Sequence, residues 1–192
     1  MIEKFEEEIS NFFGSSYAVA TDSCTHAIEL CLRLLKPNKL IIPTNTYISI
    51  PFTAIKLNIP FEWQEIKWED YYQLTENIYD AAVLWQNDSY IKDSYMCLSF
   101  QFKKHLSLGR GGAILLDNYD DYNILKKMSY DGRDFNTPWK DQNINIIGYH
   151  YYMTPEIAKM GLDKLEEAKQ KEPTKWAYLD YPYLPNMEIF KG

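Results

Sequence analysis

The sequence has few of the residues that build metal sites and disulfide frameworks. It contains three histidines and three cysteines in 192 residues. The histidines are scattered, and no HExxH pattern or Cys/His cluster predicts a zinc site. The cysteine count is odd and no pair has CxxC spacing, so we expect free thiols in a reducing compartment rather than a disulfide framework.

Long apolar runs and an excess of basic residues are also missing. No stretch reaches the roughly 18 apolar residues of a transmembrane helix, and the acidic, amphipathic N-terminus is unlike a signal peptide. Acidic residues outnumber basic ones by 27 to 20, which gives a net charge of −7. This balance argues against a nucleic-acid or anionic-membrane binder. We therefore expect a cytoplasmic protein without nucleic-acid or membrane partners.

Apolar and aromatic residues, in contrast, are plentiful. They make up enough of the chain, 46% apolar, to predict a globular fold, and the length suits one domain. With 16 Tyr, 9 Phe and 5 Trp, some aromatic rings must lie on the surface, in a cleft or at a subunit contact. We expect a compact domain over residues 1–170 and an extended aromatic, proline-rich tail over residues 171–192.

The apolar pattern alternates between helical and strand spacing over the first two-thirds of the chain. This alternation predicts an α/β fold with a reduced, mostly parallel sheet flanked by helices, and with ligands bound at the carboxyl ends of strands. Residues 132–147 are polar and predict a loop, while residues 67–78 fit no element. Helices are expected at residues 2–13, 27–35, 46–57, 118–130 and 155–169, and strands at residues 17–20, 40–42, 61–66, 81–85, 95–100 and 113–116.

The strongest local motif is a lysine pair, Lys103-Lys104, between an apolar strand and a Gly-rich turn. A lysine next to a second cation has a lowered amine pKa, which favours nucleophilic attack on an aldehyde. The glycines that follow allow the backbone to approach a ligand closely. An ordinary loop with exposed lysines is the alternative.

Three further places in the sequence have side chains suited to an anionic or aromatic ligand. Ser23, Cys24 and Thr25 stand at a helix start, where free N–H groups bind phosphate, although simple N-capping is commoner. Asp80 precedes an apolar run, where its carboxylate needs a partner such as a protonated ring nitrogen, unless it is a turn residue facing water. Tyr47 can stack on an aromatic ring or pack in the core.

In order and spacing, these motifs resemble the DegT/DnrJ/EryC1/StrS family of sugar aminotransferases, which depend on pyridoxal 5′-phosphate (PLP). The resemblance runs from about residue 5 to residue 168. The segments that carry it are Ala18–Ile28, Ile41–Tyr47, Asp80–Ala82, Ser99-Phe100 with Lys104 and Gly109–Gly112, Asp131–Arg133 and Gly148–Thr154.

The resemblance implies a fold-type I PLP-dependent transferase large domain and a role for each matching residue. Lys104, five residues after Ser99, would hold PLP as a Schiff base and shuttle a proton. Asp80 would pair with the ring nitrogen, and Tyr47 would cover the ring. Ser99, Thr25, Ser23 and the amides near Cys24 would hold the phosphate. The family forms homodimers, so the loop carrying His150 would reach the neighbouring subunit's cofactor.

The implied reaction moves an amino group from glutamate or glutamine to a keto-sugar, with a nucleotide-linked sugar as the expected substrate and lipopolysaccharide among the expected product classes. Three departures favour a second hypothesis, a PLP-fold accessory protein without transaminase activity. The chain is shorter than usual for the family. Val83 replaces a hydrogen-bonding residue near the cofactor's phenolic oxygen, and His150 and Tyr152 replace the Asn and Arg of the late motif. A third hypothesis, a sugar dehydratase, is disfavoured because Lys104 is retained.

Overall fold

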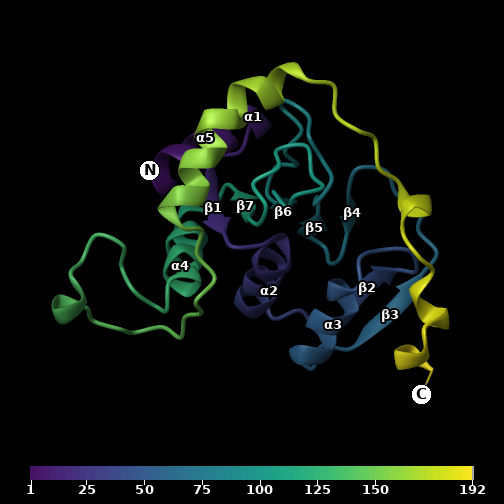
Figure 1. Cartoon of the computed structure of the whole chain (residues 1–192). Coiled ribbons are helices and arrows are strands. Elements are labelled where there is room, and N and C mark those ends of the chain that lie inside the picture. Colours follow the sequence, from purple (N-terminus) through teal and green to yellow (C-terminus); the bar gives the residue numbers. More distant parts are fainter. Residues whose placement is uncertain (192) are drawn as a thin grey trace.

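The computed structural model describes residues 1–191 and shows a central sheet with helices on both faces (Figure 1). Three short 3-10 helices follow the last α-helix, and another lies at Trp139–Asp141. The α-helices are α1 (Ile2–Phe13), α2 (Cys24–Leu35), α3 (Ser49–Lys56), α4 (Tyr119–Ser129) and α5 (Pro155–Gln170). The strands are β1 (Tyr17–Thr21), β2 (Leu40–Pro43), β3 (Phe61–Gln64), β4 (Tyr72–Gln73), β5 (Ile78–Asp80), β6 (Tyr95–Ser99) and β7 (Gly112–Leu116).

The strands form one five-stranded sheet in the order β1-β7-β6-β5-β4 and a separate β2–β3 pair. The expectation of a mostly parallel sheet was wrong. Only β5–β6 in the larger sheet and the β2–β3 pair are parallel, whereas β1–β7, β6–β7 and β4–β5 are antiparallel. Within the sheet, β4 and β5 follow each other directly, as do β6 and β7. Both pairs are joined without a helix, and a parallel pair needs a longer crossover, usually helical.

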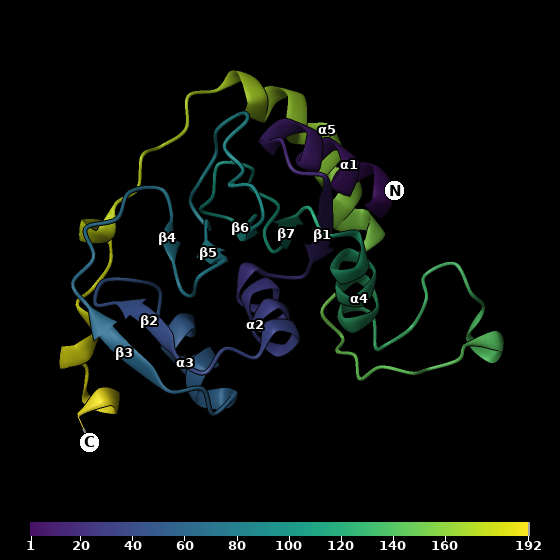
Figure 2. The same ribbon diagram turned by 180° about the vertical axis from the view of Figure 1, so that it is seen from behind.

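Side chains of the sheet alternate between two apolar cores, as the two-residue period of a strand requires. On β1, Val19 packs in the core beneath α2, α3 and α4, while Ala18 and Ala20 pack in the core beneath α1 and α5. On β7, Ile114 and Leu115 divide in the same way. Both faces of the sheet are therefore covered, which leaves the strand ends as places for a site. Figure 2 shows α2 and α4 together on one side of the sheet and α1 beside α5 on the other.

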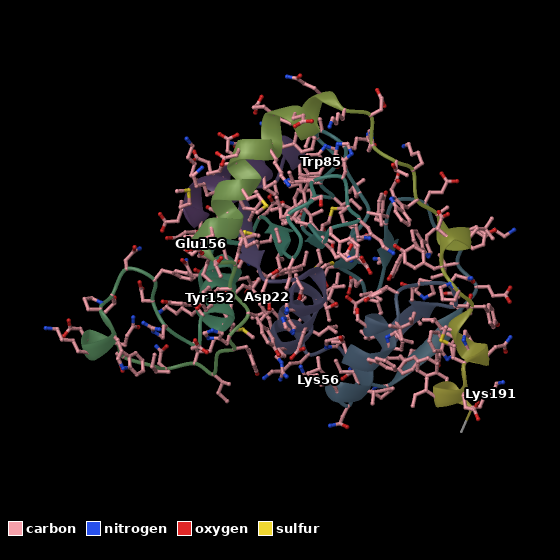
Figure 3. The ribbon with its side chains drawn as sticks, viewed as in Figure 1. Asp22, Lys56, Trp85, Tyr152, Glu156 and Lys191 are labelled. Carbon is pink, nitrogen blue, oxygen red and sulfur yellow. The ribbon has the colours of Figure 1, made fainter. Side chains whose placement is uncertain are left out.

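The predicted helices form, but one predicted strand does not. Residues 81–85 were expected as a strand, and instead the chain leaves β5 after Asp80 and turns. The Ala82 N–H donates to the Asp80 carboxylate at 2.9 Å, a local turn bond that competes with strand pairing. The buried Ala81, Leu84 and Trp85 account for the apolar run, and Trp85 packs beneath the end of α5 (Figure 3).

The tail after α5 returns along the β2–β3 pair (Figure 1). Its backbone is bonded to the body, with Tyr178 N–H donating to Trp68 O at 3.0 Å and Leu184 N–H donating to Thr44 O at 2.8 Å. The division into a domain over 1–170 and a tail over 171–192 stays a prediction, and Gly192 lies outside the described residues. Within residues 1–191, every helix is too short or too polar to cross a membrane.

Candidate active site

A cavity of about 450 Å³ lies at one edge of the larger sheet. Because β1, β5 and β6 run in the same direction, their carboxyl ends meet at this edge. Seven of the eight residues predicted for the site line the cavity: Ser23, Cys24, Thr25, Tyr47, Asp80, Ser99 and Lys104. Positions spread over 82 residues of sequence therefore lie around one space, as the motif order predicts. The roles of these residues stay predictions.

His150 is the exception, because it does not line this cavity. It pairs with Tyr130 in an antiparallel bridge at the base of the arm formed by residues 131–149. This arm extends away from the sheet beside α4 (Figure 2). Its side chain is exposed, and its Nδ1 is 2.9 Å from Asp131 Oδ2. A contact between His150 and the cavity of its own chain is therefore not made.

Lys104 follows β6 on the loop that joins β6 to β7. Its backbone N–H donates to Gln101 O at 2.7 Å, which closes a tight turn and directs the side chain to the cavity. Burial lowers the pKa of the Lys104 amine and Lys103 lowers it further, against the opposing effects of Cys24 and Asp80. The amine is 5.3 Å from the centre of the Trp176 ring. A free amine, the form that attacks aldehydes, is thus favoured at a lower pH than for an exposed lysine.

Asp80 ends β5 with its side chain buried at the cavity wall. Its Oδ2 accepts a hydrogen bond from the Tyr72 hydroxyl at 2.6 Å, and its Oδ1 accepts one from Ala82 N–H. Burial raises the pKa of Asp80, and these two bonds together with Lys104 partly oppose that rise. Within residues 1–191 the carboxylate has no ion pair closer than 4 Å. A cationic ligand atom beside Asp80 would supply the charge that the fold omits.

The start of α2 forms one wall of the cavity. Ser23 is the N-cap, with its Oγ accepting from His26 N–H at 3.2 Å, and Thr25 Oγ1 donates to Ser49 Oγ at 2.9 Å. The first N–H groups of a helix have no intrahelical acceptor and favour an anion. Gly112 lets β7 approach this turn, because a Cβ at that position would lie 2.5 Å from Cys24 N.

Other cavity residues were missed from the sequence. Tyr72 lies in the stretch 67–78 to which no element was assigned, and Trp176 and Tyr181 lie in the tail. The only available signal was the density of aromatic residues in both segments. Arg110 also lines the cavity and pairs with Asp22 at 2.7 Å beside the start of α2 (Figure 3).

Comparison with models of protein families shows which family the chain belongs to. The model of the DegT/DnrJ/EryC1/StrS aminotransferase family matches residues 1–81 and 91–181. The chain therefore belongs to the DegT/DnrJ/EryC1/StrS aminotransferase family, as its motifs predicted. A search of curated protein sequences found no match.

Solved structures share the fold at low sequence identity. Spr1654 from Streptococcus pneumoniae, solved in a PLP form, is 17% identical with a TM-score of 0.71, over 87% of this chain and 59% of that one. The sugar aminotransferase CalS13 from Micromonospora echinospora is 12% identical with a TM-score of 0.74, over 88% and 61%. PseC from Helicobacter pylori, an aminotransferase of pseudoaminic acid biosynthesis, is 13% identical with a TM-score of 0.69, over 86% and 57%.

These matches confirm the predicted fold class, the α/β large-domain fold of fold-type I PLP-dependent transferases. The chain spans about three fifths of the length of these structures.

Proposed function

We propose that this protein binds PLP in the cavity and transfers an amino group from glutamate or glutamine to a keto-sugar, with a nucleotide-linked sugar as the substrate. One observation carries the proposal. The Lys104 amine and the Asp80 carboxylate, which has no ion-pair partner among residues 1–191, line the same cavity in a chain of this family. An amine and an isolated carboxylate around one space fit the aldehyde and the ring nitrogen of PLP.

When bound, PLP supplies an aldehyde that condenses with amines and a ring that withdraws electrons from the carbon bearing the amino group. Lys104 would hold the cofactor covalently and move a proton at the substrate carbon. Asp80 would keep the ring nitrogen protonated, and Tyr47 would cover the ring. Ser23, Thr25, Ser99 and the backbone around Cys24 would hold the phosphate, which the helix start favours.

Lys104 is suited to proton transfer by its surroundings. Burial and Lys103 lower its pKa, so the neutral amine that accepts a proton is available nearer to neutral pH. Its half-buried position at the cavity wall, beside Trp176, limits contact with water. The same amine can therefore serve first as an attachment point and then as a base.

We further propose that the protein acts as a homodimer in the cytoplasm. Exposed apolar side chains on the arm, including Trp139 and Ile147, support a subunit contact on that side. His150 is exposed at the base of the arm, where it can approach the cavity of a second subunit. The three free cysteines support a reducing compartment.

Covalent capture of PLP tests the cofactor. After incubation with PLP and reduction with borohydride, we expect mass spectrometry to find the cofactor mass on the peptide that contains Lys104. The matched variants are Lys104→Arg, which should lose the modification, and Lys103→Arg, which should keep it. Modification that survives Lys104→Arg and disappears in Lys103→Arg would contradict the assignment.

Amino transfer is tested on the same loaded protein. Adding glutamate or glutamine should convert the bound cofactor to its amine form, seen as loss of its visible absorbance together with release of the oxo-acid. The alternative function is a PLP-fold accessory protein, which Val83 at the cavity wall favours because it offers no hydrogen bond. Capture on Lys104 without any amino transfer from either donor would support that alternative.

A further inference from the structure

Thr46, Tyr72 and Asp80 form a buried chain of hydrogen bonds at the cavity wall. Tyr72 donates to Asp80 Oδ2 at 2.6 Å, and Thr46 Oγ1 is hydrogen-bonded to the Tyr72 hydroxyl. An ionised carboxylate only accepts, so the Tyr72 proton points to Asp80 and the Thr46 hydroxyl must donate to Tyr72. The bonds therefore run in one direction, from Thr46 through Tyr72 to the carboxylate.

Strand pairing sets this arrangement. Tyr72 is directly opposite Asp80 in the antiparallel β4–β5 pair, and its ring is held by Trp68, 5.1 Å away between ring centres. The side chains of Thr46, Tyr72 and Asp80 are each at most 6% exposed. Water therefore contributes little to solvating Asp80, and the hydroxyl of Tyr72 takes that place.

We propose that Tyr72 is a positioning residue for the cofactor, in that its hydroxyl, supported by Thr46, holds the Asp80 carboxylate in place as the partner of the ring nitrogen. This inference rests on the proposed function. Tyr72 acts through Asp80 and not on the substrate, and its position on β4 lies outside every motif that the sequence showed.

The electrostatics around Asp80 agree with this role. Burial raises the pKa of Asp80 and the Tyr72 bond opposes that rise, while burial and the nearby carboxylate raise the pKa of Tyr72 itself, so it stays protonated as a donor. Among the other titratable groups near Asp80, burial lowers the pKa of Lys104 and raises the pKa of each of the rest, which therefore stay uncharged at neutral pH. Those groups are Cys24 of α2, Cys97 of β6 and Tyr181 of the tail.

The first test uses the protein without cofactor. In Tyr72→Phe, which removes one hydroxyl and keeps the ring, NMR of ¹³C-labelled aspartate should show the titration midpoint of Asp80 raised by about one pH unit or more, the effect of one hydrogen bond to a charged group. Thr46→Val should raise it by less, in the same direction. The matched control is Tyr71→Phe, because the neighbouring Tyr71 ring is exposed and the donors to Asp80 are Tyr72 and Ala82, and it should not move the midpoint.

The second test uses the protein loaded with ¹⁵N-labelled PLP. In Tyr72→Phe, the cofactor should remain on Lys104 after borohydride reduction, but the ring ¹⁵N signal at neutral pH should move from the protonated toward the neutral position. The reason is that a carboxylate with one donor fewer is more basic and takes a larger share of the proton. Tyr71→Phe should retain the wild-type signal.

The outcomes separate this inference from the proposed function. If the wild-type protein fails to attach PLP, the proposed function is overturned and the positioning role falls with it. If PLP attaches but folded Tyr72→Phe shows an unchanged Asp80 midpoint and ring signal, the positioning role alone is overturned. Should Tyr72→Phe fail to fold, Thr46→Val decides the same question, with a shift supporting the role and no shift overturning it.

Discussion

The packing region between α1 and α4 and the cavity region each bury a carboxylate, and they satisfy it differently. Glu6 is 3% exposed and Asp80 is 6% exposed. Glu6 accepts two hydrogen bonds from the Lys126 ammonium, both at 2.8 Å, and one from Ala20 N–H. Asp80 is hydrogen-bonded by a hydroxyl and a backbone N–H, both neutral.

The difference separates a carboxylate that holds the fold together from one that is available to a ligand. The Glu6–Lys126 pair neutralises its own charge and joins α1 to α4. Asp80 keeps a negative charge next to an open cavity, at a cost to stability, because a buried charge without an ionic partner is poorly solvated. Burial raises the pKa of both groups, but only Asp80 can gain a cation from outside the chain.

The largest expected effect is on the packing region. Lys126→Met should lower the free energy of unfolding by about 3–5 kcal/mol, since it leaves the Glu6 charge buried without its partner. Urea unfolding followed by circular dichroism measures the change. Lys127→Met, on the same helix and without an ion pair in the described chain, is the control and should cost about 0.5 kcal/mol or less. A loss below about 1 kcal/mol in Lys126→Met would show that Glu6, like Asp80, tolerates burial without an ionic partner.

The same kind of substitution should have the opposite sign at the cavity. Asp80→Asn is expected to stabilise the cofactor-free protein by about 1 kcal/mol at pH 7, because it removes a buried charge that has no ionic partner in the described part of the chain. Glu6→Gln should destabilise, since it leaves Lys126 unpaired. Unfolding free energies of both variants in the same buffer test this contrast. If Asp80→Asn destabilised the cofactor-free protein as much as Glu6→Gln does, the predicted contrast would be contradicted.

The smallest effect is in the pH dependence of stability. Burial alone would raise the pKa of Glu29, but hydrogen bonds from Lys56 and Arg33 lower it overall. Glu29 therefore contributes stability above its unfolded pKa of roughly 4.3, and this contribution is lost as the pH falls through its lower folded pKa. Asp80, with its raised folded pKa, shows the reverse. The contribution of Asp80 to stability is fully present below its unfolded pKa and is lost as the pH rises through its folded pKa.

Difference curves against Glu29→Gln and Asp80→Asn isolate the two contributions. The wild-type advantage over Glu29→Gln should shrink as the pH falls below about 4, by roughly 1.4 kcal/mol for each unit of pKa difference between the folded and unfolded states. The wild-type disadvantage against Asp80→Asn should instead appear as the pH rises. If both difference curves changed with pH in the same direction, the predicted contrast between the pKa shifts of Glu29 and Asp80 would be contradicted.

Local rules predicted the helices well. The 3.6-residue period and Gly14 bound α1, Asn118 caps α4 with its side chain, and Pro155 begins α5. They failed where a side chain or a long-range pairing competes with periodicity. The Asp80 carboxylate captures Ala82 N–H and ends β5 early, and the short strand β4 exists only because β5 pairs with it.

The sequence by itself determined which residues of its motifs, from Ser23 to Lys104, line the cavity. Each of them follows a strand or begins a helix, and local patterns specify those elements. The tertiary structure decided that Tyr72 stands opposite Asp80, that the tail brings Trp176 to Lys104, and that His150 stays outside. The physical reason is that hydrogen-bond register and burial depend on partners distant along the chain, and no spacing within one segment records them.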